Sequence, residues 1–180
     1  MSDHLRESDT VAGVLVGDLE VFSDDRGDSA ELFRSEWFPS QTWEQIQSNR
    51  SHSRAGVLRG LHFHHKQTDY WHFMAGRLRV GLYDLRPDSP THGRGEVLEF
   101  SGDEFRGLFI PPGVAHGYYA VTDAVLLYVV DQFYSGEDEY GLAWNDPELG
   151  LDWGESGPPI LSERDAANPT LAALPAEELP

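Results

Sequence analysis

Short segments in which apolar and polar residues alternate constrain most strongly how this chain can fold. In "GRLRVGLYDLR", Leu78, Val80 and Leu82 alternate with Arg77, Arg79, Gly81 and Tyr83. Because neighbouring side chains of a strand point to opposite faces, this period of two predicts a strand with one buried face. The segments "RGLFIPPG" and "AVLLYVVDQFY" are also strand-like, since they are apolar, rich in β-branched and aromatic residues, and bounded by turn residues. Many short strands separated by turns predict an all-β sandwich or closed barrel of the jelly-roll type.

Helical periodicity is limited to one segment, "SEWFPSQTWEQIQSN", which predicts a short helix after Pro39 with Ser40 or Thr42 as its N-cap. The stretches "RPDSPTHGRGE" and "YSGEDEYG" are rich in turn residues and predict connectors. At 180 residues the chain is expected to form one domain, residues 1–180. The last stretch, "ANPTLAALPAEELP", predicts a C-terminal surface tail from about residue 168.

Charge and composition exclude several classes of partner. The chain carries 31 acidic and 13 basic residues, a formal net charge of −18, which repels nucleic acids and anionic membrane surfaces. No apolar run approaches the roughly 20 residues needed to span a bilayer, and the polar start "MSDHLRESDT" lacks the apolar core of a signal peptide. The chain has no cysteine, hence no disulfide and no thiolate chemistry. These features predict a cytoplasmic protein with no nucleic-acid or membrane partner.

One segment reverses this charge balance. Between Asn49 and Arg79, six basic residues stand against a single acid, Asp69, and five of the eight histidines lie in the same stretch. A cationic segment within an anionic protein is what a site for an anionic small molecule requires, because it focuses the field where the ligand binds. The alternative is a cluster of basic side chains on one strand face with no ligand.

A metal site is one explanation for the histidines. His62 and His64 are two residues apart in "HFHH" and therefore share one face of a strand, and "IPPGVAH" supplies His116. The order of these motifs resembles the metal-binding motifs of cupins, in which a glutamate follows the histidine pair. Here Asp69 and His72 follow it instead. Imidazole ligands suit zinc, iron, copper or nickel.

Proton chemistry is a second explanation, since histidine titrates near neutral pH and acts as a base when a partner orients it. Tyrosine can serve as the complementary acid, and Tyr128 lies in the apolar strand "AVLLYVVDQFY", a position that also suits a core tyrosine. Arginine is the preferred clamp for phosphate because its planar fork meets two oxygens. Arg59 precedes His62 by three residues.

Taken in order, the motifs resemble those of the dTDP-4-dehydrorhamnose 3,5-epimerases, a family of cofactor-independent enzymes of dTDP-rhamnose synthesis. The resemblance extends from about residue 13 to 170. Its elements are "DDRG" followed by a glutamate, "QSN", "GVLRGLHF", "DLRPDSPTHG", "IPPGVAHGY", "LLYVVDQFYS", "WNDPELGLDW" and "LSERDAANP". It implies a cupin-type β jelly roll with a few short helices, and a homodimer whose sites are shared between the two chains.

The resemblance also implies a reaction and the residues that perform it. The substrate would be a nucleotide-linked 4-keto-6-deoxy sugar of the dTDP type, inverted at C3, C5 or both through an enolate by an isomerase without cofactor or metal. His62 would be the base that removes a proton next to the carbonyl, Asp165 its orienting partner, and Tyr128 the acid that returns a proton to the opposite face. The substrate-binding residues would be Arg26, Glu31, Gln47, Asn49, Arg59, His116, Glu139 and Arg164.

Three residues depart from the family pattern. Asp69 stands where the family commonly carries a lysine near the substrate carbonyl, Asp28 replaces an aromatic residue after "RG", and His64 replaces glutamine or a similar residue. An acid beside a developing enolate disfavours it, so an altered substrate or number of inverted centres is expected. Two alternatives stay open: a metal-dependent cupin enzyme using His62, His64 and His116, and a sugar-nucleotide-binding jelly roll without catalysis.

Overall fold

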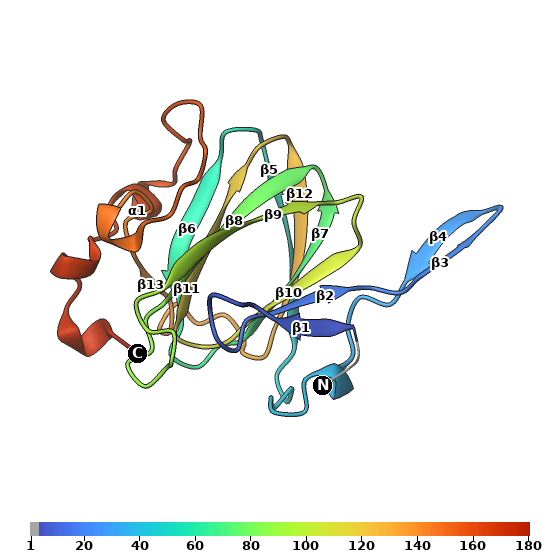
Figure 1. Cartoon of the computed structure of the whole chain (residues 1–180), viewed down its shortest axis with the longest axis horizontal. Coiled ribbons are helices and arrows are strands. Elements are labelled where there is room, and N and C mark those ends of the chain that lie inside the picture. Colours follow the sequence, from blue (N-terminus) through green and yellow to red (C-terminus); the bar gives the residue numbers. More distant parts are fainter. Residues whose placement is uncertain (1–3) are drawn as a thin grey trace.

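Two antiparallel sheets form the body of the molecule in the computed structural model, which describes residues 4–180 (Figure 1). The first sheet has the order β1–β2–β10–β7–β12–β5 and the second the order β13–β6–β11–β8–β9. The strands of the first are β1 (Leu5–Glu7), β2 (Leu15–Asp18), β5 (Gln47–Ser53), β7 (Asp69–Ala75), β10 (Arg106–Ile110) and β12 (Ala124–Val130). Those of the second are β6 (Leu58–Phe63), β8 (Arg77–Asp84), β9 (Gly95–Ser101), β11 (Val114–Ala120) and β13 (Tyr140–Gly141). The predicted all-β jelly-roll sandwich is confirmed.

The hydrophobic core lies between the two sheets. Leu78, Val80 and Leu82 of β8 point into it, as their alternation predicts, and meet Trp71 and Phe73 from β7 of the other sheet. Because every second residue of β8 is apolar, one face of the strand is withdrawn from water, which stabilises the sandwich.

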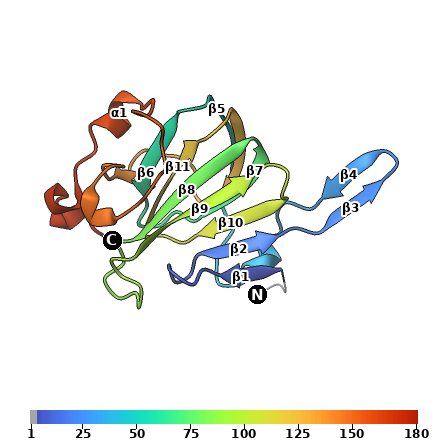
Figure 2. The ribbon, with the colours of Figure 1, turned by 45° about the horizontal axis from the view of Figure 1, so that its top comes forward.

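The outer face of the five-stranded sheet is also covered. Trp153 packs against Gly81, where a Cβ atom would lie 2.4 Å from the indole ring. Leu142, Leu149 and Leu174 belong to the same buried cluster as Tyr83, so segments that follow β13 lie on this face. Figure 2 shows these segments beside β6 and β8.

The helices are few and short. They are α1 (Glu163–Ala166) and the 3-10 helices Ser35–Trp37, Pro147–Leu149, Leu171–Ala173 and Ala176–Glu178. Across residues 4–180, none of the helices is long and apolar enough to cross a lipid bilayer.

The predicted helix after Pro39 is wrong. The only helical turn in this region precedes Pro39, neither Ser40 nor Thr42 caps a helix, and residues 39–46 form turns and bends that lead into β5. Tertiary packing explains the difference: Phe38 stacks on Phe109, with ring centroids 4.8 Å apart, and is buried. A short helix has a costly nucleus, and this aromatic packing holds the segment in an irregular conformation instead.

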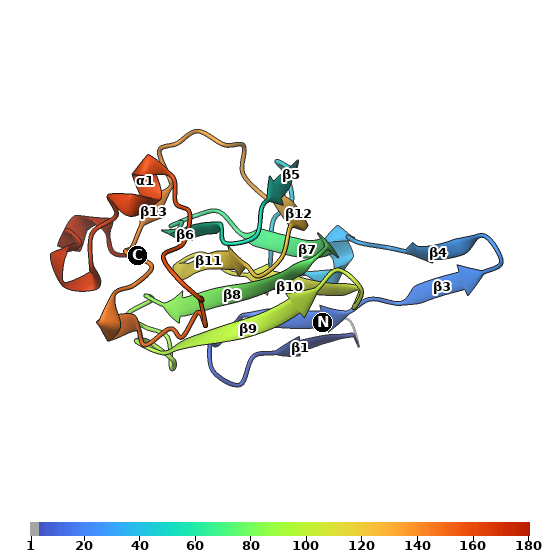
Figure 3. The same ribbon diagram turned by 90° about the horizontal axis from the view of Figure 1, so that it is seen from above.

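A two-stranded hairpin stands away from the body. It consists of β3 (Val21–Asp24) and β4 (Gly27–Ala30), pairs with neither sheet, and projects to one side of the sandwich (Figure 3). Phe22 on this hairpin is 58% exposed, which is costly for a large apolar side chain in water.

Candidate active site

A pocket of about 440 Å³ opens between the two sheets. Side chains from β5, β6, β7, β11 and β12 form its wall, so both sheets contribute. Residues that the sequence marked as candidates line it: Gln47, Asn49, Arg59, His62, His116, Tyr128 and Glu139. The fold thus brings together residues from four separate motifs and from the connector "YSGEDEYG".

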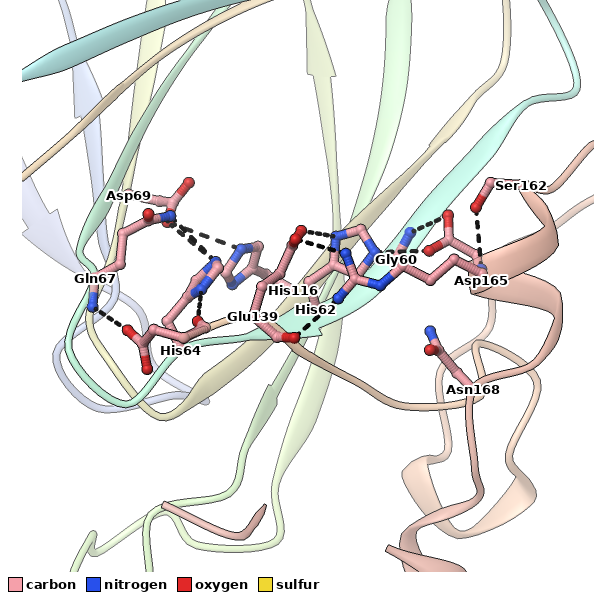
Figure 4. A network of polar contacts seen from close by, with 12 residues as sticks. Gly60, His62, His64, Gln67, Asp69, His116, Glu139, Ser162, Asp165 and Asn168 are labelled. Carbon is pink, nitrogen blue, oxygen red and sulfur yellow. Dashed lines mark hydrogen bonds and ion pairs between the residues drawn. The ribbon is translucent and has the colours of Figure 1, made fainter. Parts of the chain in front are cut away.

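His62 is held by a buried carboxylate. Its Nε2 lies 2.7 Å from Oδ1 of Asp165, a residue 103 positions further along the chain (Figure 4). Burial alone would raise the pKa of Asp165, but its hydrogen bond to His62, with those from the Gly60 amide and Ser162, lowers it below its usual range. Asp165 is therefore a carboxylate that accepts a hydrogen bond from Nε2–H, and this leaves the lone pair of the ring on Nδ1.

Helix α1 aims Asp165 at the ring. The Ser162 side chain accepts a hydrogen bond from the Asp165 amide at 3.0 Å and so caps the helix. In a capping box the acid at this position turns back to the cap residue. Here the Asp165 carboxylate instead reaches His62 and the amide of Gly60.

Two glycines allow β6 and β11 to approach closely beside this pair. A Cβ on Gly60 would lie 2.8 Å from Cα of Gly117, and one on Gly117 would lie 2.5 Å from the Arg59 carbonyl oxygen. Gly60 also has φ +118°, which disfavours any other residue. The register of the two strands shifts between His116 and Tyr118, and His116 pairs with His62. The close approach therefore places two imidazoles side by side on one wall of the pocket.

Glu139 closes the other side of His62. Its Oε1 lies 3.8 Å from His62 Nδ1, while its Oε2 lies 2.5 Å from Arg164 Nη1. Arg164 also donates to the Glu139 backbone carbonyl at 2.9 Å. Arg164 itself does not line the pocket and acts on it through Glu139.

Tyr128 lies on the opposite sheet from His62. It is in β12, paired with Asn49 of β5 and Trp71 of β7. Burial raises the pKa of the Tyr128 phenol, and the negative charge of Asp69 raises it further. The phenol therefore stays protonated at neutral pH.

Arg59 brings positive charge to the pocket. Its Nε donates to Ser53 Oγ at 2.9 Å, and Ser53 lies 3.0 Å from the hydroxyl of Tyr118. These contacts tie β6 to β5 and leave part of the guanidinium available to an anion.

A second group of polar side chains could hold a metal ion. One ligand atom from each of His64, Asp69 and His116 lies within 4.8 Å of the other two. The ligand set considered from the sequence is therefore corrected, because His62 faces Asp165 and Glu139. His72 is buried beside Tyr70, its ring nitrogens without a hydrogen bond within residues 4–180.

Besides Arg164, two other expected substrate-binding residues, Arg26 and Glu31, lie outside the pocket. Arg26 is at the tip of the β3–β4 hairpin, 89% exposed, and pairs with Asp24. Glu31 follows the hairpin and pairs with Arg34. Neither lines the pocket between the sheets.

Sequence reasoning missed two residues that build the site. The Asp138 carboxylate accepts hydrogen bonds from the backbone amides of His65, Lys66 and Gln67 at 2.9 to 3.2 Å. These bonds fix the loop between β6 and β7. Nothing in "YSGEDEYG" distinguishes it from a turn residue. Ser162 could have been found, since "SERD" fits the capping-box pattern at a helix start.

A sequence model of the dTDP-4-dehydrorhamnose 3,5-epimerase family matches residues 8–173. The chain belongs to this family. A dTDP-4-dehydrorhamnose 3,5-epimerase from Neisseria gonorrhoeae is 37% identical over 161 residues, which cover 85% of this chain and 48% of that protein. The chain therefore spans about half the length of this relative.

Solved structures of epimerases have the same fold. The Mycobacterium tuberculosis rmlC epimerase superposes with a TM-score of 0.91 at 32% identity, covering 100% of this chain and 94% of that one. ChmJ, a 3'-monoepimerase from Streptomyces bikiniensis in complex with dTDP-quinovose, gives a TM-score of 0.88 at 30% identity, covering 97% and 92%. The predicted family, its jelly-roll fold and the epimerase class, an isomerase, are confirmed.

Proposed function

We propose that this epimerase inverts C3, C5 or both of a dTDP-linked 4-keto-6-deoxy sugar. The observation that carries the proposal is the His62–Asp165 pair, with an Nε2–Oδ1 distance of 2.7 Å, on the wall of a pocket whose other sheet carries Tyr128. A base and an acid on opposite walls can remove a proton from one face of a carbon and return one to the other.

His62 takes the proton. Hydrogens on the carbons beside a ketone are acidic because the carbanion is delocalised as an enolate. Asp165 accepts a hydrogen bond from the Nε2–H group, so the Nδ1 lone pair is the base, and the Asp165 charge stabilises the imidazolium that forms. Inversion is complete when the protonated phenol of Tyr128 delivers its proton to the opposite face of the carbon.

The enolate oxygen needs donors, and this chain differs from its family there. Arg59 supplies a cation in the pocket, while Asp69 stands where the family commonly has a lysine. Donors placed where charge develops lower the barrier. With Asp69 in place of a lysine, the pocket fits a substrate, or a number of inverted carbons, different from those of typical family members.

The hairpin supports a shared site in a homodimer. Arg26 and Glu31 lie on or beside an arm that projects from the body and exposes Phe22. We propose that the arm contacts a second copy of the chain, where Arg26 and Glu31 bind the nucleotide or diphosphate. We also propose a cytoplasmic location. The chain has no cysteine and so forms no disulfide, the bond that is typical of proteins in oxidising compartments.

Deuterium exchange tests the reaction. Protein incubated in D₂O with dTDP-4-keto-6-deoxyglucose should introduce deuterium at C3, C5 or both, observed by NMR of the recovered sugar. Incorporation at one carbon alone would identify a monoepimerase. Binding of the sugar nucleotide without deuterium at either carbon, across several 4-keto sugars, would contradict the proposal and support a binding protein.

A further inference from the structure

We propose that His64, Asp69 and His116 bind one divalent transition-metal ion on the wall of the pocket. His116 lies on β11, Asp69 begins β7, and His64 opens the loop between β6 and β7. The Asp69 Oδ2 atom lies 3.8 Å from His64 Nε2 and 4.0 Å from His116 Nε2 (Figure 4). All three side chains are buried, so an ion held there would be largely shielded from water.

Both imidazoles are oriented as metal ligands are. His64 Nδ1 lies 2.5 Å from the Asp138 carbonyl oxygen and His116 Nδ1 lies 2.9 Å from the Val114 carbonyl oxygen. A carbonyl only accepts, so each Nδ1 carries the proton and each Nε2 of the neutral ring carries a lone pair. Histidine ligands almost always donate their second ring N–H to a carbonyl or carboxylate in this way.

The Gln67 side-chain amide lies between two of the acceptor atoms and donates hydrogen bonds to them. Its side-chain nitrogen lies 2.9 Å from Asp69 Oδ2 and 3.2 Å from His64 Nε2. One amide group can satisfy both, because it carries two N–H donors. A cation would interact with the same two atoms, and with His116 Nε2, which has no hydrogen-bond partner among residues 4–180.

Asp69 is a buried carboxylate that lacks a strong cationic partner. Only 3% of the residue is exposed, and Trp71 Nε1 and the Gln67 amide are its hydrogen-bond donors. Within the described part of the chain, no arginine or lysine lies within 4.0 Å of it. A buried negative charge without a cationic partner is costly, and a divalent ion would offset that cost.

The donor set selects the class of metal. Two imidazole nitrogens and one carboxylate oxygen suit Zn²⁺, Co²⁺, Fe²⁺ or Ni²⁺, whereas Mg²⁺ and Ca²⁺ prefer oxygen ligands. Ligands at about 2.1 Å from a tetrahedral ion are roughly 3.4 Å apart, so side-chain shifts on the order of 1 Å would close the site. The fourth position would face the pocket, which His64, Asp69 and His116 all line.

A metal ion here differs from the metal-free site expected from the sequence. If the proposed epimerase function holds, the ion would supply the positive charge that a lysine at the position of Asp69 supplies in other family members. This one point rests on the proposed function. Binding itself does not depend on that function.

Metal titration tests the inference. Untagged full-length protein is treated with chelator, desalted and titrated with Co²⁺ and Zn²⁺ at pH 7.5 by calorimetry, with the Co²⁺ visible spectrum as a second signal. We expect one ion per chain with a dissociation constant of micromolar or lower, and a rise in the melting temperature of the wild-type protein. No stoichiometric binding of either ion to folded wild-type protein would overturn the proposal.

Variants assign the ligands. Asp69→Asn and His64→Gln should each weaken binding at least tenfold, while His92→Ala, which removes an exposed histidine outside the pocket, should not change it. His62→Asn should abolish deuterium exchange but keep metal binding, so the two proposals fail separately. Equal affinity in wild type and both ligand variants, or loss of the ion in His62→Asn, would overturn this ligand assignment.

Discussion

At the scale of residues, the four histidines between positions 62 and 72 differ in the hydrogen-bond partner of each ring. His62 is bonded to a carboxylate, while His64 and His65 are bonded to the backbone carbonyls of Asp138 and Glu178. His72 is buried away from the pocket, and burial lowers its pKa to about 4. One ring is thus paired with a carboxylate, as the proposed base requires, two are held in place by the backbone, and one is a neutral core residue.

Substitution of Asp165 should slow the reaction. Asp165→Asn keeps the shape of the side chain but removes the charge that stabilises the imidazolium of His62. We expect kcat to fall about 100-fold or more, with KM changed less than threefold, as measured by the exchange assay. Glu163→Gln on the exposed face of the same helix is the control and should keep wild-type activity. An Asp165→Asn variant with more than half of the wild-type kcat would contradict the role of this carboxylate.

The sequence motifs make His62 in "GLHF" and Asp165 in "LSERD" candidates, and the structure brings the two side chains into contact. The contact between them could not be derived from spacing, because it joins residues 103 positions apart. That Asp69 rather than His62 groups with His64 and His116 could not be derived from spacing either. It depends on the pairing of β11 with β6 and on the loop that Asp138 fixes.

At the scale of elements, the strands follow from local pattern and the helices do not. The period of two places Leu78, Val80 and Leu82 of β8 in the core, but Gly81 and Tyr83 on its other face are buried as well, under the C-terminal segments. Helix α1 has four residues, too few for a helical period to show, and the chain at Pro39 is anchored by the contacts of the preceding Phe38 with Tyr70 of β7 and Phe109 of β10. The site depends most on the β6–β11 pair, where glycines permit the close approach.

Gly117→Ala should disturb this pair. The added methyl would lie 2.5 Å from the Arg59 carbonyl oxygen, so the strands must separate. We expect a loss of about 1–3 kcal/mol in the free energy of unfolding, measured by urea denaturation, together with a loss of activity. Gly157→Ala is the matched control because nothing lies within 4 Å of its Cβ. Equal stability of the two variants would mean that the close approach is not required.

The loop between β8 and β9 predicts a pH dependence. Burial alone would raise the pKa of Asp84, but hydrogen bonds from Arg86, Ser89 and Thr91 lower it from its ordinary 3.8 to about 2. Because the folded-state pKa is the lower one, the stabilisation is fully present above pH 4 and is lost as the pH falls towards 2.

Asp84→Asn tests this dependence. The variant should lose about 2 kcal/mol of stability at pH 7, and its difference from wild type should shrink between pH 4 and pH 2. Urea midpoints at pH 7, 4, 3 and 2 measure both effects. A difference that stays constant over this range would show that the charge of Asp84 does not stabilise the loop.

At the scale of the whole molecule, the arm and the pocket belong to different parts of the surface. The body holds His62, Asp165 and Tyr128, while Arg26 and Glu31 lie on or beside the hairpin. A single sequence does not reveal whether such residues act within one chain or across two. If the proposed dimer forms, light scattering should give twice the 20.2 kDa mass of the chain.

The dimer proposal makes a kinetic prediction for Arg26. Arg26→Ala should raise KM about tenfold through loss of a charge-assisted hydrogen bond to the diphosphate, with kcat nearly unchanged. Arg94→Ala, another exposed arginine, should leave KM unaltered. A monomeric protein with full activity, or an Arg26→Ala variant with wild-type KM, would contradict the shared site.

The most direct test of the central claim follows deuterium incorporation and configuration at the same carbon in wild type, His62→Asn and Tyr128→Phe. Wild type should incorporate deuterium and invert the centre. His62→Asn should do neither, because no base remains. Tyr128→Phe should still exchange, since His62 can return a proton to the face from which it came, but should not invert. Exchange at the wild-type rate in His62→Asn, or inversion in Tyr128→Phe, would contradict the assignment of base and acid.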